Sequence, residues 1–293
     1  MKQRNIPAIE VLSEVYPRTL VNLLPLDTDH LDLILESSSL VFQLRPYYSY
    51  EERQVLLRKL IPRLYRQAMR IFKEIDRNRY PETSPYSPGR PWNVEKTLEN
   101  YLQSGDLYFT YKHVVSIRRL RRHYPVVLLI DKSHSVLQHL RLIILTSILF
   151  SLSTDLNNLA IIGFDSLPDI LKGFRDSWMT PTEMIRRLIE LASGGKTNIF
   201  LAVQAAMKEL ETQISSHKTL ILMSDLLATS GKNFIPLLAK VKDVRIIITP
   251  RKHLFQLTKP IIGQLRRFGN IRLYYMPVEA QEIPLMLEKV LFS

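Results

Sequence analysis

The fold of this chain is decided by residues 126–135, which read VVLLIDKSHS. The unbroken apolar run Val126–Ile130 predicts a strand buried on both faces, because a half-buried strand would alternate apolar and polar residues. The strand ends at Asp131, and two hydroxyl residues follow, Ser133 and Ser135. Open α/β sheets bind their ligands at the carboxyl ends of such strands. The stretch therefore predicts a mostly parallel sheet with a polar site at its edge.

Two later segments bring similar polar residues to a chain turn or a strand end. Residues 193–199, SGGKTNI, form a Gly-rich turn that carries Thr197, and residues 219–225, TLILMSD, form an apolar run that ends in Asp225. Together with the first stretch they supply two carboxylates and three hydroxyls. An all-oxygen set suits Mg²⁺ or Mn²⁺ and is poor for zinc or copper. We therefore predict a magnesium or manganese site made of Asp131, Ser133, Ser135, Thr197 and Asp225.

This pattern resembles the metal-ion-dependent adhesion site (MIDAS) of von Willebrand factor A (vWA) domains. That site combines Asp-x-Ser-x-Ser with a distant Thr and a more distant Asp, and all five positions occur here in the same order. The resemblance implies an α/β fold with a doubly wound, mostly parallel, Rossmann-like sheet. It also implies that the two serines and Thr197 ligate the metal directly. Asp131 and Asp225 would then act mainly through water and by orienting the hydroxyls.

The chain departs from the family pattern at four positions near this site. Lys132 and His134 stand where small or apolar residues are usual, and Lys196 and Leu226 stand where glycine is common. An uncompensated positive charge close to a cation opposes its binding. Long lysine side chains usually extend into solvent, so we expect both lysines to do so. We expect His134 to lie in a solvent-facing loop.

Beyond residue 115 the apolar patterns alternate between strand and helix. A helix is predicted to begin at Pro181, with Thr180 as its N-terminal cap. Such alternation predicts a vWA-like domain over 116–293 with helices on both faces of the sheet. The predicted strands are 126–130, 159–164, 220–224, 244–249 and 271–276, with an antiparallel edge strand at 169–174, and the predicted helices are 136–151, 181–192, 199–213, 233–240, 259–268 and 281–291.

Residues 1–115 predict a small, mainly helical N-terminal region. The strongest signal is an amphipathic helix at 55–75, which Pro62 can kink. The Pro-rich segment 79–93 predicts a long exposed loop that serves as a connector. The remaining predictions for this region are short helices at 11–24 and 31–40, a helix at 92–102 and a strand-like stretch at 107–117.

Composition restricts the functional classes. The 293 residues contain no cysteine, which excludes disulfides, thiolate catalysis and Cys-ligated metals. The net charge of +12 divides equally between the parts before and after Pro125, and its sharpest cluster is 118–122, RRLRR. Such a cluster can meet phosphates, but a solvated connector is the favoured interpretation. The apolar stretch 140–153 is interrupted by Arg141 and is too short to span a membrane. A cytoplasmic location is expected.

The layout of the whole chain resembles the CoxE-like, or MoxR-associated, subgroup of vWA proteins. In that subgroup a helical region leads through a Thr-containing helix and a basic stretch into the Asp-x-Ser-x-Ser strand. Thr97 and residues 118–122 fit that arrangement. The resemblance implies an adaptor for a MoxR-type AAA+ ATPase in the remodelling or maturation of a protein complex. The sequence has no G-x-x-x-x-G-K-[ST] phosphate loop, so any ATP hydrolysis must come from a partner.

The functional expectation is therefore a metal-dependent protein-binding module that is not an enzyme. The metal would keep one coordination position open for a Glu or Asp of the partner. One alternative is a Mg²⁺-dependent hydrolase acting on a phosphate, which is disfavoured because His134 is the only obvious base and the carboxylates are few. Another is an RNA-binding protein of the Ro-like kind, which is disfavoured because 115 residues are too short for its helical repeats.

Overall fold

The computed structural model describes most of the chain from residue 49 onward. The predicted short helices at 11–24 and 31–40 lie outside the described residues, as do four of the five residues of the basic cluster 118–122. By its internal contacts the chain divides into two compact units, Met1–Phe72 with His123–Ser293, and Lys73–Arg122. The predicted boundary after residue 115 stays a prediction. The described residues are 49–78, 82–86, 88, 92–118, 124–191, 194–249, 255–277, 279 and 282–292.

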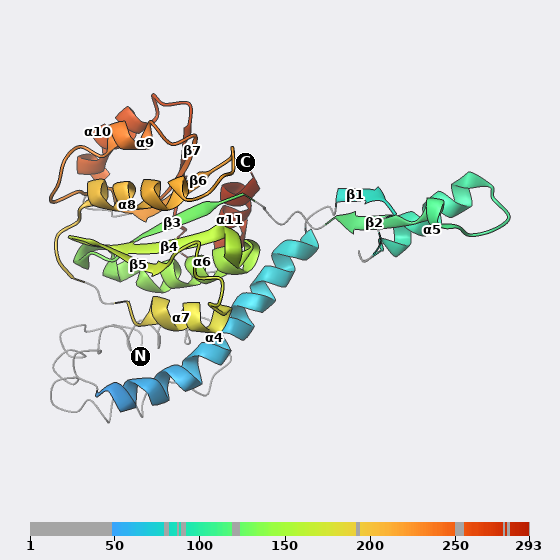
Figure 1. Cartoon of the computed structure of the whole chain (residues 1–293), viewed down its shortest axis with the longest axis horizontal. Coiled ribbons are helices and arrows are strands. Elements are labelled where there is room, and N and C mark those ends of the chain that lie inside the picture. The colour runs from blue at the N-terminus through green and yellow to red at the C-terminus, as the bar shows by residue number, and fades with distance from the viewer. Residues whose placement is uncertain are drawn as a thin grey trace. The chain divides into compact units, whose positions relative to one another are not determined.

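The larger unit is built on a six-stranded sheet of order β5-β4-β3-β6-β7-β8 (Figure 1). All neighbouring strands are parallel except β5, which pairs antiparallel with β4 at one edge. The predicted fold class is confirmed, including the antiparallel edge strand. The strands are β3 (Val126–Asp131), β4 (Leu159–Phe164), β5 (Pro168–Lys172), β6 (Thr219–Ser224), β7 (Asp243–Ile248) and β8 (Ile271–Tyr275).

The strand order places β3 at the switch point of the sheet. β3 has β4 on one side and β6 on the other, so the chain winds outward from β3 in both directions. Ligands of open α/β sheets bind beside the carboxyl ends of strands at such a point. The register pairs Asp131 with Phe164 of β4 and Ile130 with Met223 of β6. Asp131 therefore lies beside the last residue of β6, Ser224.

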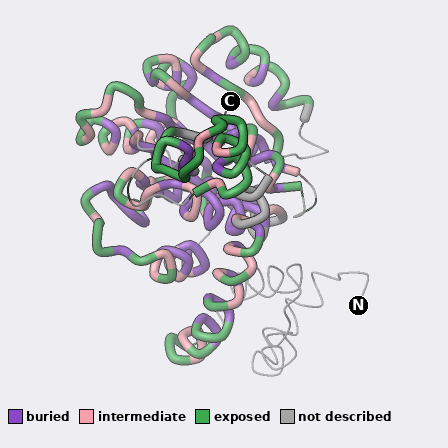
Figure 2. The backbone as a smooth tube through the Cα atoms, turned by 90° about the vertical axis from the view of Figure 1, so that its right-hand side faces the viewer, coloured by how far each residue is buried: buried purple, intermediate pink, exposed green. Residues whose placement is uncertain are grey.

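Helices cover both faces of the sheet, as its unbroken apolar strands require. Side chains of α8, α9 and α10 pack on one face together with Val127 and Leu129. α6 and α11 lie on the other face (Figure 1). In Figure 2 the buried residues gather in the interior of the larger unit and the exposed ones at its surface. The helices are α6 (Leu140–Ser153), α7 (Pro181–Ile189), α8 (Ile199–Glu211), α9 (Ile235–Leu238), α10 (Phe255–Leu265) and α11 (Ile283–Phe292).

The amphipathic helix predicted at 55–75 is α4 (Tyr50–Asn78), whose part up to Phe72 belongs to the sheet unit. Its buried side chains recur at helical spacing, at Leu57, Leu60, Leu64, Ala68 and Ile71. Near its start, the side chain of Gln54 donates a hydrogen bond of 3.1 Å to Glu190 Oε1 at the end of α7. None of the described helices is long and apolar enough to cross a membrane.

The smaller unit combines two short antiparallel strands with one helix. The strands are β1 (Glu82–Pro85) and β2 (Val115–Arg118), and the helix is α5 (Val94–Ser104). The loop predicted at 79–93 is therefore wrong at 82–85, which form the strand β1. Proline is tolerated in this strand because both strands of a two-stranded sheet are edge strands. The strand-like stretch predicted at 107–117 is also too long, since Tyr111–His113 form a 3₁₀ turn before β2.

Candidate metal centre

Asp131 is the most firmly held of the predicted site residues. It ends β3, and only 1% of its surface is exposed. Its Oδ1 accepts a hydrogen bond of 2.9 Å from the backbone N–H of Ser133. Its Oδ2 accepts one of 2.6 Å from the hydroxyl of Ser224, which ends the neighbouring strand β6. Both carboxylate oxygens are thus fixed by residues at the carboxyl edge of the sheet.

The electrostatic environment of Asp131 opposes its negative charge. Burial raises the pKa of this carboxyl from 3.8 to about 6, against the lowering effect of the hydrogen bonds from Ser133 and Ser224. The charge of Asp225 raises that pKa further. The two carboxylates therefore lie close enough to repel each other, and a bound cation would relieve this repulsion.

Asp225 follows β6 directly and is 2% exposed. Its Oδ1 accepts a hydrogen bond of 3.0 Å from the backbone N–H of Leu227. The residue between them, Leu226, has φ of 62°, a left-handed conformation that is unfavourable for a leucine. The Leu226 side chain is fully buried, and its N–H donates 3.0 Å to the hydroxyl of Ser224. Ser224 therefore links Asp131 to the turn that carries Asp225.

The two serines stand where the chain leaves β3. Ser133 is buried and Ser135 is half-buried in the short 3₁₀ helix η3 (His134–His139). Their hydroxyl oxygens are 2.9 Å apart and hydrogen-bonded to each other. Hydroxyls this close can serve one small cation together. The backbone N–H of Val136 donates 3.0 Å to the carbonyl of Ser133, which closes the turn.

Thr197 is held by the loop that follows β6. Its backbone N–H donates 2.8 Å to the hydroxyl of Thr229, and its carbonyl accepts from the N–H groups of Thr229 at 3.0 Å and Ser230 at 3.2 Å. On the other side, the N–H of Asn198 donates 2.7 Å to the carbonyl of Asp165 after β4. Thr197 itself is 2% exposed. The sheet edge thus joins the Thr197 turn to the loops after two different strands.

The turn before Thr197 needs a glycine. Gly195 has φ of 83°, and a Cβ there would lie 2.7 Å from the hydroxyl oxygen of Ser166. That hydroxyl accepts a hydrogen bond of 3.0 Å from the N–H of Lys196 and donates one of 3.2 Å to its carbonyl. A side chain at position 195 would both strain the backbone and displace the hydroxyl of Ser166.

The position of Lys132 corrects an expectation from the sequence. Its side chain is only 10% exposed and does not extend into solvent. Its Nζ lies 3.7 Å from a carboxylate oxygen of Asp165 in the β4–β5 turn and 3.8 Å from one of Asp169 in β5. These carboxylates offset the lysine charge, so it opposes a cation less than the sequence alone indicates. Lys196 is exposed, as expected, and the side chain of His134 is outside the described part.

The donor set fits a hard divalent cation. Among the described residues there is no group of three or more His, Cys, Asp or Glu that could hold a metal. A metal at this edge would therefore depend on two buried carboxylates together with hydroxyls, which is oxygen chemistry suited to Mg²⁺ or Mn²⁺. The ligand set Asp131, Ser133, Ser135, Thr197 and Asp225 stays a prediction.

Two further residues support the centre and were not predicted from the sequence. Ser224 directly precedes Asp225, and a hydroxyl at the end of a buried strand was a usable signal. Thr229 lies 32 positions after Thr197, and no spacing rule connects the two. Only the fold brings the Thr229 hydroxyl to the backbone of Thr197.

Thr229→Val is expected to weaken Mg²⁺ binding about three- to tenfold, whereas Thr229→Ser is expected to leave it unchanged. Valine removes the acceptor for the Thr197 N–H, and a lost hydrogen bond of this kind costs roughly 0.5–1.5 kcal/mol. Mg²⁺ titrations followed by melting temperature measure the change. Equal Mg²⁺ affinity in the valine and serine variants would show that the hydrogen bond to the Thr229 hydroxyl does not position Thr197.

Solved structures similar to the chain include proximal thread matrix protein 1 from the mussel byssus, with 13% identity, a TM-score of 0.46, and coverage of 58% of this chain and 47% of that one. A second structure of that protein, titled as having a zinc-occupied MIDAS motif, gives 14% identity and a TM-score of 0.45, with the same coverages. The chain thus spans less than half of the mussel protein.

Another similar structure is the conserved hypothetical protein BatB from Bacteroides thetaiotaomicron. It has 14% identity and a TM-score of 0.41, and the match covers 58% of this chain and all of that one. No curated protein matches the chain. One protein family does match, described as "VWA domain containing CoxE-like protein", over residues 64–246.

The doubly wound sheet and this family match define a vWA domain protein. Because the match extends over well more than half of the 293 residues, the chain belongs to the CoxE-like family of these proteins.

Proposed function

We propose that this chain is a metal-dependent protein-binding adaptor, without catalysis of its own, that works with a MoxR-type AAA+ ATPase. The observation that carries the proposal is the pair of buried carboxylates, Asp131 and Asp225, at the switch point of a parallel sheet. Their mutual repulsion and the raised pKa of Asp131 favour a site built to receive a cation. The hydroxyls of the predicted set would complete its first layer of ligands.

A bound Mg²⁺ or Mn²⁺ supplies an open position that attracts an anionic oxygen. The residues of this chain would orient that position through two hydrogen bonds. The hydroxyl of Ser224 donates to Asp131, and the N–H of Thr197 donates to the hydroxyl of Thr229. Neutral hydroxyl ligands leave much of the metal's charge uncompensated, so a carboxylate from a partner protein is a suitable further ligand. Lys196, which is exposed beside Thr197, adds positive charge that favours an acidic partner segment.

The same features disfavour catalysis. Hydrolysis at a metal needs a positioned base and usually more carboxylate ligands, and the predicted set contains only two carboxylates, Asp131 and Asp225. The sequence also has no phosphate loop, so the energy of remodelling would come from the partner ATPase.

The experiment that tests the proposal is a binding assay between the full chain and a purified MoxR-type ATPase, with Mg²⁺ and with EDTA. Binding is expected in Mg²⁺ and is expected to fall more than tenfold in EDTA or with Thr197→Ala, the scale seen when residues supporting a metal are lost. Thr197→Ser keeps the hydroxyl and serves as the matched control. Equal retention in EDTA and by Thr197→Ala would mean that the ATPase does not bind through the metal.

A further inference from the structure

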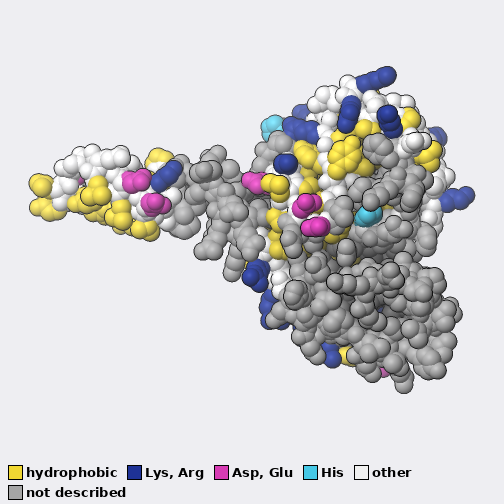
Figure 3. Space-filling view, turned by 180° about the vertical axis from the view of Figure 1, so that it is seen from behind, with side chains coloured by type: hydrophobic (Ala, Val, Ile, Leu, Met, Phe, Trp, Pro, Cys, Tyr) yellow, Lys and Arg dark blue, Asp and Glu magenta, His cyan; other side chains and the backbone are white. Residues whose placement is uncertain are grey.

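The smaller unit exposes a continuous apolar stripe along α5. Val94, Leu98 and Leu102 are 65%, 52% and 77% exposed. Residues spaced by four lie on one side of a helix, so these three side chains form a single line. Leu107 and Tyr108, which follow the helix in the chain, are also exposed, by 88% and 80%. Figure 3 shows apolar side chains gathered on this unit beside acidic ones.

This stripe is not the surface that holds the unit together. The adjacent side of α5 carries Thr97, which is buried and whose hydroxyl accepts a hydrogen bond of 2.9 Å from the N–H of Val115 in β2. Beside it, the ring of Tyr101 packs edge-on against that of Phe109, with centroids 5.5 Å apart. The helix is thus attached by one side, and the stripe is left without a partner inside the described part of the unit.

A buried histidine completes the internal packing of the unit. His113 Nδ1 accepts 2.9 Å from the N–H of Thr110, so Nε2 carries the proton and donates 2.6 Å to Asp106. Asp106 is also 2.7 Å from Lys112 Nζ, and these two partners hold the pKa of its carboxyl down at about 2. The unit therefore has its own polar and aromatic core, and substitutions on the exposed stripe should leave it folded.

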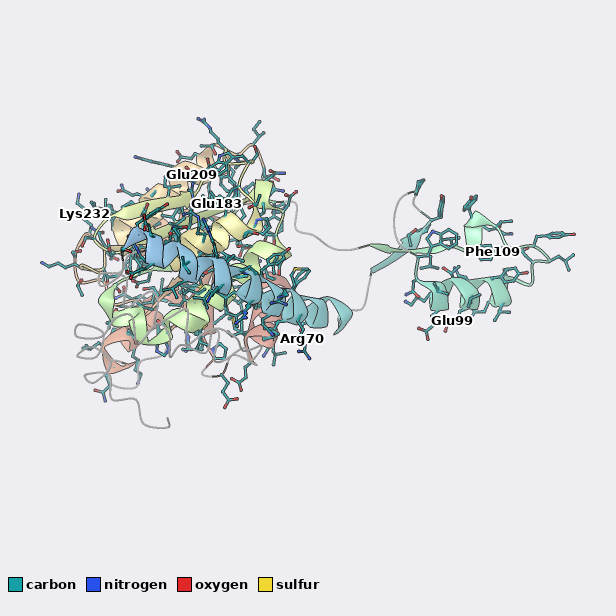
Figure 4. The ribbon with its side chains drawn as sticks, turned by 90° about the horizontal axis from the view of Figure 1, so that it is seen from below. Arg70, Glu99, Phe109, Glu183, Glu209 and Lys232 are labelled. Carbon is teal, nitrogen blue, oxygen red and sulfur yellow. The ribbon has the colours of Figure 1, made fainter. Side chains whose placement is uncertain are left out.

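The charges beside the stripe are acidic. Glu95 and Glu99 are exposed and form the next row round the helix, and Lys96 lies beyond them. In Figure 4, Glu99 points outward from α5, on the side away from Phe109. An acidic border opposes binding to an anionic membrane or to nucleic acid, since both attract basic residues. It also opposes pairing of α5 with a second copy, because glutamates would face glutamates.

We infer that α5 is a docking helix for an amphipathic helix of a partner protein. The apolar stripe of the partner helix covers Val94, Leu98 and Leu102, and its lysines or arginines face Glu95 and Glu99. The spacing of the stripe suits the i, i+4 and i+7 anchors of a helix laid along it, and the acidic row sets its orientation. This surface contains none of the predicted metal ligands, so docking here needs no metal.

The test uses the full chain carrying Trp178→Phe, which leaves Trp92 as its one tryptophan, next to the start of α5. The probes are two designed helical peptides with the same leucine stripe, one flanked by lysines and one by glutamates, in EDTA. The lysine peptide is expected to change Trp92 fluorescence saturably and to bind several-fold more tightly than the glutamate peptide. Leu98→Lys with Leu102→Lys should weaken it by about tenfold or more, since both leucines would lose the burial of their side chains against the peptide. Ile214→Lys, at a fully exposed site of the larger unit, should have no effect.

Charge reversal makes the test specific. Glu95→Lys with Glu99→Lys is expected to invert the preference, so that the glutamate peptide binds more tightly, and the gap should shrink as salt screens the charges. Equal binding of the two peptides by the parent chain would overturn the inference. So would tighter binding to phosphatidylserine vesicles than to the lysine peptide. Self-association that depends on Leu98 and Leu102, seen by sedimentation, would assign the stripe to a second copy instead.

Discussion

Asp131→Asn is expected to raise the free energy of unfolding of the metal-free protein by about 3 kcal/mol at neutral pH. The reason is that burial raises the pKa of this carboxyl from 3.8 to about 6, so its ionised form is held at a cost in the folded state. Asparagine keeps an oxygen for the Ser133 N–H and can donate from its amide to the Ser224 hydroxyl. The substitution therefore removes the charge and retains the hydrogen bonds.

The pH dependence has a definite sign. The folded protein holds the Asp131 proton more tightly than the unfolded chain, so rising pH lowers its stability between about 3.8 and 6. The variant lacks this group. The two proteins should differ little in this contribution below pH 3.8 and differ fully above pH 6. Urea unfolding in EDTA across pH 4–8 measures the difference, and Glu211→Gln, at an exposed carboxylate, is the neutral control.

Added Mg²⁺ is expected to reverse the order. A ligand that binds only the folded state stabilises it by about 4.1 kcal/mol at a thousand times its dissociation constant, which exceeds the advantage of the variant. The wild-type protein should gain this increment, and Asp131→Asn should lose most of it, because the variant offers the metal one charge fewer. An asparagine variant that is no more stable than wild type in EDTA at pH 7.5 would contradict the electrostatic account of this site.

The sheet was predictable because its strands are unbroken apolar runs. The predicted strand 159–164 coincides with β4, and Thr180 caps α7 through the N–H of Glu183 at 3.2 Å, as its sequence signal indicates. The loop at 79–93 and the strand at 107–117 were harder, because β1 and β2 are short and neither has an apolar run. Their pairing depends on contacts between residues 30 to 36 positions apart, such as Glu82 with Arg118.

The candidate metal centre was partly predictable for the same reason. Asp131 ends β3 and Asp225 directly follows β6, and parallel strands bring their carboxyl ends to one edge. The surroundings of the centre were not, since Lys132 meets Asp165 and Asp169 only across β4 and β5. A lysine with no local partner in the sequence is therefore assigned to solvent by default. The fold supplies its counter-charges from more than 30 residues away.

Leu226 has a backbone conformation that the sequence alone does not reveal. The family pattern favours glycine there, and the leucine of this chain adopts the left-handed conformation that a glycine would adopt freely. The sequence shows the substitution but not whether the turn changes to accommodate it. The structure keeps the turn and buries the leucine completely, in one cluster with Val203 and Phe234. The burial of the Leu226 side chain thus offsets the energetic cost of its left-handed backbone conformation.

Leu226→Gly is accordingly expected to destabilise the protein by about 2–4 kcal/mol, because losing a buried leucine costs more than relief of a left-handed residue returns. Leu226→Ala loses most of the side chain and keeps the strain. The free energy of unfolding of the glycine variant should therefore equal or exceed that of the alanine variant. At ordinary positions glycine lowers this free energy by roughly 0.5–1 kcal/mol relative to alanine. The same pair at Leu222, buried in the regular strand β6, should show the ordinary order. Urea unfolding of the four variants measures this, and an ordinary order at Leu226 would mean that the turn carries no strain for packing to offset.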